Sequence, residues 1–164
     1  MNYWLIADPH MGHRLLETEE YGSRPSKFED IILKNLQLIQ PNDVLISLGD
    51  NSFYNHEYWN ARLTEAVHSS VKKWLVLGNH DKKSIKWYLS NGWDFAASEI
   101  RLALYGFNII LSHIPVNNCY DFVNVHGHLH TKQHRDFKQS SSHFLVSMEL
   151  NNYRPVSLRS ILGA

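Results

Sequence analysis

Side chains that bind metal ions occur in five groups along this chain, and each group follows a short apolar run. The groups are Asp8-Pro9-His10, Gly49-Asp50, Gly78-Asn79-His80-Asp81, Ser112-His113 and Gly127-His128-Leu129-His130. Histidine accounts for 11 of the 164 residues. It is the commonest metal ligand in proteins and the side chain that titrates nearest to neutral pH. The positions of these histidines therefore point to chemistry.

The spacing within the groups favours convergence of their side chains. Asp8 and His10 are two residues apart, so an extended chain points both to the same side. His128 and His130 have the same spacing, and Gly127 before them allows the chain to approach another segment closely.

Each group alone also has a structural interpretation that involves no metal. An aspartate such as Asp8 can cap a helix, and Gly49-Asp50 after a strand can be an ordinary turn. Gly78-Asn79-His80-Asp81 can combine a turn with a helix cap, and His113 can be a hydrogen-bonded histidine at the end of a strand. All five groups, in order and each after an apolar run, favour one shared site.

The candidate ligands are oxygen and nitrogen donors, with no thiolate among them: Asp8, His10, Asp50, Asn79, His113, His128 and His130. Such a set suits Mn, Fe, Zn, Co or Ni and argues against an iron–sulfur or structural zinc site. The ligands are too many for one ion but suit two ions that share a carboxylate. Two divalent ions would leave a positive surplus that attracts phosphate, and such pairs clamp phosphorus for in-line attack.

The elements that must position these groups are five strands and the helices between them. The apolar runs are Tyr3–Ala7, Val44–Leu48, Trp74–Leu77, Phe107–Leu111 and Phe122–Val125. Continuous runs rich in Val, Ile and Leu are typical of strands buried on both faces. Ligands of open α/β sheets bind beyond the carboxyl ends of the strands, so we expect the five groups to meet there.

Three helices are predicted in the first half of the chain. Ser26–Ile39 opens with the capping-box pattern Ser26-Lys27-Phe28-Glu29 and has apolar residues at helical spacing. Glu57–Val67 and Lys82–Leu89 show weaker helical patterns. The alternation of strands and helices predicts a parallel α/β arrangement.

The second half has a different pattern. Alternation over Ile100–Leu104, followed by Gly106 and an apolar run, indicates a hairpin. Phe144–Met148 and Val156–Leu158 are further predicted strands, and Thr131–Ser142 a polar surface loop. We expect a mixed sheet, or two sheets packed together and flanked by helices, in a single domain of residues 1–164.

Composition restricts the class of protein. Lysine plus arginine and aspartate plus glutamate number 16 each, so the net charge of zero disfavours a protein that coats nucleic acid. Cys119 is the only cysteine, which favours a reducing, cytoplasmic location. Neither a signal peptide nor a membrane span is expected.

The five groups, as an ordered set over residues 8–130, resemble the motif series of the calcineurin-like metallophosphoesterases. More narrowly, the chain resembles the small bacterial and phage members of that family. The residues that carry this resemblance are Asp8-Pro-His-Met-Gly-His13, Arg24-Pro25 and the closing segment 152–158. The resemblance implies an α/β fold, a four-layer αββα sandwich of two mixed β-sheets flanked by helices, with the metals at the carboxyl ends of the strands.

The resemblance also implies a division of roles in a hydrolase of phosphoric esters. One ion would be held by Asp8, His10, Asp50 and His130, and the other by Asp50, Asn79, His113 and His128, so that Asp50 bridges. A hydroxide between the ions, with Mn the expected metal, would attack phosphorus. His80 would be the general acid, oriented by Asp81, because an alkoxide leaving group needs a proton near neutral pH.

Residues beyond the motifs have weaker predictions. His13 and Arg24 are candidate contacts to the substrate phosphate. His126 is expected in packing or behind the ligands, and surface positions are expected for His56, His68, His134 and His143.

The expected substrate is a phosphodiester, either a small molecule or a nucleotide, with monoesters left open. One alternative is a DNA or RNA nuclease on the same fold, which would predict a basic, aromatic-lined groove. Another is a non-enzymatic interaction module, which would tolerate loss of ligands or of the catalytic histidine. The chain keeps all of them. The oligomeric state is left open.

Overall fold

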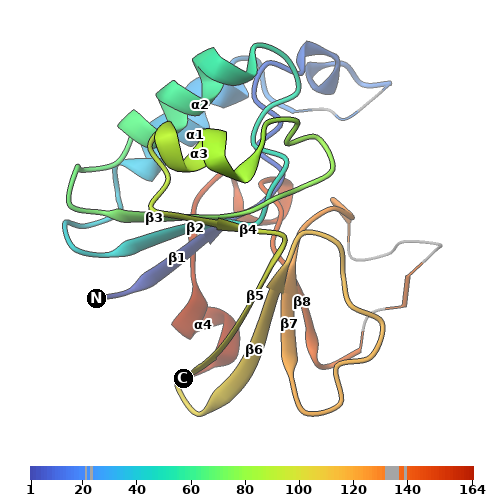
Figure 1. Ribbon diagram of the computed structural model, residues 1–164. Helices are drawn as coiled ribbons and strands as arrows, with labels where there is room; N and C mark the ends of the chain where they lie inside the picture. Colours follow the sequence, from blue (N-terminus) through green and yellow to red (C-terminus); the bar gives the residue numbers. More distant parts are fainter. Residues whose placement is uncertain (21, 23, 132–136, 139) are drawn as a thin grey trace.

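The first sheet of the protein is mixed and five-stranded, as the computed structural model shows (Figure 1). Its order is β4-β3-β2-β1-β9, with β1 (Tyr3–Ile6), β2 (Val44–Ser47), β3 (Lys72–Val76), β4 (Phe95–Ala97) and β9 (Val156–Ser157). The first four strands are parallel, and β9 is antiparallel to β1. Every residue of β2 is buried, which explains its uninterrupted apolar sequence. The structure describes residues 1–20, 22, 24–131, 137, 138 and 140–164.

Three helices cover the outer face of this sheet (Figure 1). They are α1 (Phe28–Leu36), α2 (His56–Glu65) and α3 (Ile85–Ser90), and each lies within about three residues of a predicted helix. On α1, Phe28, Ile32 and Leu36 are almost fully buried and pack in one cluster with Ile6 and Leu45 of the sheet. The helical spacing of apolar residues therefore correctly indicated which face of α1 meets the sheet.

The start of α1 differs from the predicted capping box. The residue before the helix is Lys27, whose backbone is left-handed (φ 57°), and its side chain makes no capping hydrogen bond. Glu29 instead accepts a hydrogen bond from the backbone N–H of Gly12 at 3.1 Å. This tertiary contact ties α1 to the loop after β1.

The second sheet is formed by the second half of the chain, in the order β5-β6-β7-β8. Its strands are β5 (Glu99–Leu104), β6 (Phe107–Ser112), β7 (Val123–His126) and β8 (His143–Leu145). The predicted hairpin is confirmed: β5 and β6 are antiparallel and joined by Tyr105-Gly106, both with positive φ, as a tight primed turn requires. The other pairs are parallel.

The main core lies between the two sheets. Leu5, Ile46, Ile109, Leu111 and Val125 are at most 1% exposed and belong to one cluster. The predicted arrangement of two mixed sheets with helices is thereby confirmed (Figure 1). No described helix is long and apolar enough to cross a membrane.

Two elements at the margins of the sheets differ from prediction. Leu158, predicted to end a strand, begins the helix α4 (Leu158–Leu162), which packs against β1 and β9. Over the outer face of the second sheet, the described layer is the loop 113–122 rather than a helix. Val116 N–H donates to Asn124 Oδ1 of β7, and Arg101 of β5 lies over the ring of Phe122.

Candidate metal centre

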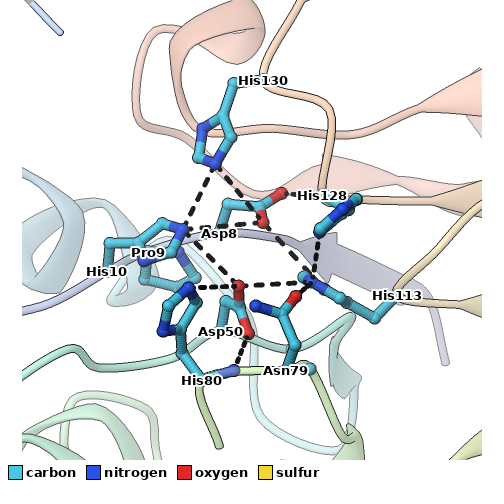
Figure 2. A network of polar contacts seen from close by, with 12 residues as sticks. Asp8, Pro9, His10, Asp50, Asn79, His80, His113, His128 and His130 are labelled. Carbon is cyan, nitrogen blue, oxygen red and sulfur yellow. Dashed lines mark hydrogen bonds and ion pairs between the residues drawn. The ribbon is translucent and has the colours of Figure 1, made fainter. Parts of the chain in front are cut away.

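The loops after β1, β2, β3, β6 and β7 meet at the carboxyl ends of these strands, and Figure 2 shows their side chains pointing toward one another. Two groups have ligand atoms that all lie within 4.8 Å of one another, and each group could hold a metal ion. We call Asp8, His10 and His130 the first group, and Asp50, His113 and His128 the second group. The convergence expected from the sequence is therefore present.

The first group is arranged around the carboxylate of Asp8 (Figure 2). His10 Nε2 and His130 Nε2 lie 3.2 Å apart, and each lies 3.8 Å from Asp8 Oδ1. Asp8 is fully buried, and its Oδ1 has no hydrogen-bond partner. A buried carboxylate oxygen without a donor is costly unless a cation is bound there. The geometry therefore fits a divalent ion.

The second group adds an amide oxygen to its imidazoles. His113 Nε2 lies 2.9 Å from Asn79 Oδ1, 3.2 Å from His128 Nδ1 and 3.3 Å from Asp50 Oδ2. Asp50 Oδ2 also lies 3.7 Å from His10 Nε2 of the first group. Asp50 Oδ2 thus lies near the ring nitrogens of both groups.

The backbone at this site is strained. Five of the candidate ligands have φ between 48° and 73°: Asp8, His10, Asp50, His128 and His130. Non-glycine residues seldom adopt this left-handed region, and such conformations persist only where surrounding contacts impose them. Here the loops after β1 and β2 hold each other: Asp8 N–H donates to Gly49 O at 3.1 Å, and His10 N–H to Asp50 O at 2.9 Å.

Two glycines allow the loops to approach the carboxylates. A Cβ atom added to Gly78 would lie 2.2 Å from Asp50 Oδ1, and one added to Gly127 would lie 2.7 Å from Asp8 Oδ2. Both distances are far below van der Waals contact. The glycines of the motifs are therefore required by space, as well as by chain direction.

Burial and neighbouring charges set the protonation of the ligands. Burial raises the pKa of Asp8 to about 6, against the opposing charges of His130 and His113. Burial alone would also raise the pKa of Asp50, but the hydrogen bond from His113 and the charge of that ring lower it to about 2. Burial, with His130, lowers the pKa of His10 to about 3. Against the effect of burial, the hydrogen bond to Asp50 raises the pKa of His113 and the hydrogen bond to Glu149 raises the pKa of His130. Neutral imidazoles and ionised carboxylates are the forms that bind metal ions, so an ion at these rings would displace protons.

His80 lies at the rim and belongs to neither ligand group (Figure 2). Its backbone N–H donates to Asp50 Oδ1 at 2.7 Å, while its Nε2 lies 4.0 Å from Asp50 Oδ2. The ring packs against Phe53, with centroids 4.8 Å apart, and its side chain is 34% exposed. The imidazole is therefore near both groups and also open to solvent.

Asp81 is not placed as expected. Its carboxylate accepts hydrogen bonds from the backbone N–H groups of Gly78, Asp50 and Asn51, at 2.8, 2.8 and 3.1 Å. Among the described residues, no hydrogen bond or ion pair joins this carboxylate to the His80 ring. Asp81 joins the loops after β2 and β3, and it fixes the backbone of Asp50 instead of orienting His80.

The candidate phosphate contacts His13 and Arg24 have different positions. Arg24 is 2% exposed, and its guanidinium donates to the carbonyl oxygens of Pro9 and Asp8 at 2.6 and 2.9 Å. These hydrogen bonds hold the guanidinium behind the ligand groups, so the prediction that Arg24 contacts the substrate phosphate is wrong. His13 does lie at the rim, where its ring stacks on Phe53 with centroids 3.9 Å apart.

Two residues at the site were not predicted. Glu149 accepts a hydrogen bond from Arg24 Nε at 2.8 Å, and its Oε1 lies 3.3 Å from His130 Nδ1. Phe53 packs against both His13 and His80. Neither has a sequence signal, because Glu149 belongs to none of the five groups and Phe53 resembles an ordinary apolar residue.

The remaining histidines differ in their surroundings. His126 is fully buried in β7, as expected for packing. His143 was expected at the surface, but it is 9% exposed and its Nε2 lies 2.8 Å from Val116 O. His68 is exposed and His56 partly buried beside Ser52, while His134 lies outside the described residues.

Comparisons with known proteins agree with this geometry. The family model of the calcineurin-like phosphoesterases matches residues 1–157. A solved structure of a protein of unknown function from Aquifex aeolicus is 26% identical, with a TM-score of 0.76 over 99% of this chain and 98% of that one. An archaeal phosphodiesterase shares the fold at 12% identity, with a TM-score of 0.51 over 90% of this chain and 82% of that one. No curated protein matches.

Proposed function

Because the chain belongs to the calcineurin-like phosphoesterases and is a hydrolase of phosphoric esters, we propose that it is a phosphodiesterase with two divalent metal ions, Mn²⁺ by preference. The observation that carries this proposal is the meeting of two ligand groups at one carboxylate. Asp50 faces His113 of the second group at 3.3 Å and His10 of the first at 3.7 Å. One shared carboxylate between two ions is the arrangement that an in-line attack on phosphorus uses.

The ligand assignment follows the two groups. Asp8, His10 and His130 would hold one ion and His113, His128 and Asn79 the other, with Asp50 shared. When bound, the ions supply positive charge for the phosphate and lower the pKa of the attacking water. The chain itself contributes imidazoles, buried carboxylates and a strained backbone that the surrounding contacts hold in place.

His80 is the proposed general acid. It lies beside Asp50 without joining either group, and its side chain is 34% exposed, so that a substrate in solvent could reach the ring. The ring is held by packing against Phe53 and by its edge contact with His10, at a centroid distance of 5.4 Å. A histidine so placed can give a proton to a departing alkoxide, which contributes roughly 10²–10⁴-fold to such reactions.

The function is tested by reconstitution. Chelator-stripped protein should regain hydrolysis of bis(p-nitrophenyl) phosphate when Mn²⁺ is added, and p-nitrophenyl phosphate should be the poorer substrate. Metal content on the same samples should approach two ions per chain. Full activity at one ion per chain would contradict the dinuclear proposal, and faster turnover of the monoester would contradict the preference for diesters.

The role of His80 is tested with two leaving groups. His80→Ala should keep both ions and lose roughly 10²–10⁴-fold in turnover of an alkyl diester. A nitrophenyl diester should be affected much less, because nitrophenolate leaves nearly unaided. His68→Ala, which removes an exposed histidine, is the matched control and should change neither. Equal losses on both diesters would leave His80 only a positioning role, and loss of metal would make it a ligand.

A further inference from the structure

Behind the first ligand group, a series of hydrogen bonds connects residues that the proposed function does not assign. Glu149 begins η2 (Glu149–Asn151), and its Oε1 lies 3.3 Å from His130 Nδ1 and 2.8 Å from Arg24 Nε. Arg24 also donates to the carbonyl oxygens of Pro9 and Asp8. One buried guanidinium therefore links η2 to the loop after β1, and Glu149 links it to the loop after β7.

We propose that Glu149, held by Arg24, is a positioning residue for the His130 imidazole and controls metal binding at the first group alone. The inference rests on the proposed function, because it takes the first group as an ion site. It concerns residues outside both ligand groups.

The Glu149 carboxylate determines the tautomer of the His130 ring. A carboxylate oxygen beside Nδ1 accepts a hydrogen bond from Nδ1–H, which leaves Nε2 unprotonated. That Nε2 lies 3.2 Å from His10 Nε2 and 3.8 Å from Asp8 Oδ1, so its lone pair belongs to the first group. Histidine ligands generally donate their other ring N–H to a carboxylate or carbonyl, which fixes the ring and makes it a stronger ligand.

Glu149 supports a histidine of the first group only. His10 Nδ1 is buried and has no hydrogen-bond partner, so within the described residues His130 is the histidine of the first group that is anchored from behind. In the second group, the Nδ1 of His113 lies 2.8 Å from the backbone carbonyl of Leu48. The two groups are therefore supported by independent contacts.

Arg24 fixes the position of the Glu149 carboxylate. Arg24 is 2% exposed, and a buried guanidinium must be paired and hydrogen-bonded. Glu149 supplies the carboxylate for that pair, so the rotamer of Glu149 is set by a rigid planar donor. Loss of Glu149 would also leave Arg24 unpaired, so a test must separate positioning from general stability.

Calorimetric titration of the chelator-stripped full chain with Mn²⁺ separates an effect on the position of His130 from an effect on general stability. The wild type should bind two ions. Glu149→Ala should bind one ion with wild-type affinity and the other about 10–100-fold more weakly. Glu149→Gln keeps an amide oxygen that can accept from His130, so its loss should be smaller.

The matched control is Glu99→Ala. Glu99 is also ion-paired with an arginine, Arg101, and its side chain is 33% exposed against 27% for Glu149, but it belongs to β5 of the second sheet. Its removal should leave both affinities unchanged. Circular dichroism and the metal-free melting temperature of each variant show whether it folds.

The outcomes separate the inference from the function on which it rests. If the wild type binds two ions and Glu149→Ala weakens neither, or both equally, the inference is overturned while the function stands. If Glu149→Ala fails to fold, Glu149→Gln and Arg24→Lys carry the same test, because both keep a side chain of similar volume. Arg24→Lys should also weaken a single ion. A wild type that binds no Mn²⁺ overturns the function and the inference together.

Discussion

Replacing Asp8 by asparagine should make the metal-free protein more stable, although it removes a proposed metal ligand. Asp8 is fully buried, and burial raises its pKa from 3.8 to about 6. Each pKa unit corresponds to about 1.4 kcal/mol, so the ionised carboxylate destabilises the metal-free fold by about 3 kcal/mol. Asparagine carries no charge, and its amide oxygen can still accept the N–H of His128, which lies 2.9 Å from Asp8 Oδ2.

The effect has a defined pH dependence. Because the pKa of Asp8 is raised in the folded state, the folded chain binds the proton more tightly than the unfolded chain. The wild type therefore loses this stability as the pH rises from about 4 through 6. Asp8→Asn should gain up to about 3 kcal/mol above this range, about 6–12 °C in melting temperature for a chain of this size, and almost nothing at pH 4.

The assay is denaturation in excess chelator at pH 4 and at pH 8, monitored by tryptophan fluorescence. Asp94→Asn is the control, since hydrogen bonds from Lys73 and Lys72 outweigh its desolvation and lower the pKa of Asp94; its replacement should bring no gain at pH 8. Adding Mn²⁺ should then stabilise the wild type more than Asp8→Asn. A metal-free Asp8→Asn that is no more stable than the wild type at pH 8 would refute the reasoning, as would an equal gain at both pH values.

Two further predictions concern the shared carboxylate. Asp50→Ala should lose both ions, whereas His10→Ala should keep one, because Asp50 Oδ2 lies 3.7 Å from His10 Nε2 and 3.3 Å from His113 Nε2; metal content after dialysis distinguishes them, and two ions retained by Asp50→Ala would exclude bridging. Gly78→Ala should displace the carboxylate of Asp50, since the new Cβ would lie 2.2 Å from its Oδ1, and should cost about 1–3 kcal/mol of stability and weaken Mn²⁺ binding. Gly106→Ala has open space around the new Cβ, but the positive φ of 82° at this turn strains an alanine, so this variant should lose stability and keep its metal affinity.

The five sequence groups that contain the candidate ligands, and the strands that precede them, could be predicted from the sequence. A buried strand needs a continuous apolar run, and parallel strands deliver their carboxyl ends to one edge of the sheet. Both properties are local in the chain or follow from connection rules, so the positions of Asp8, Asp50 and His113 could be predicted from one sequence. The helices on the first sheet followed for the same reason, since their periodicity is local.

The residues behind the site could be placed only by the tertiary structure. Arg24 and Glu149 are 125 positions apart and meet because β9 and the loops after β1 and β7 come together. From sequence, Arg24 could equally have faced a phosphate, and Asp81 could have oriented His80. The role of each buried charged side chain is decided by the hydrogen-bonding groups that surround it in the folded chain. Those partners are the carbonyls of Asp8 and Pro9 for Arg24, and backbone N–H groups from two loops for Asp81. Residue type and spacing show what a side chain can do chemically, but only long-range packing determines which neighbour it finds.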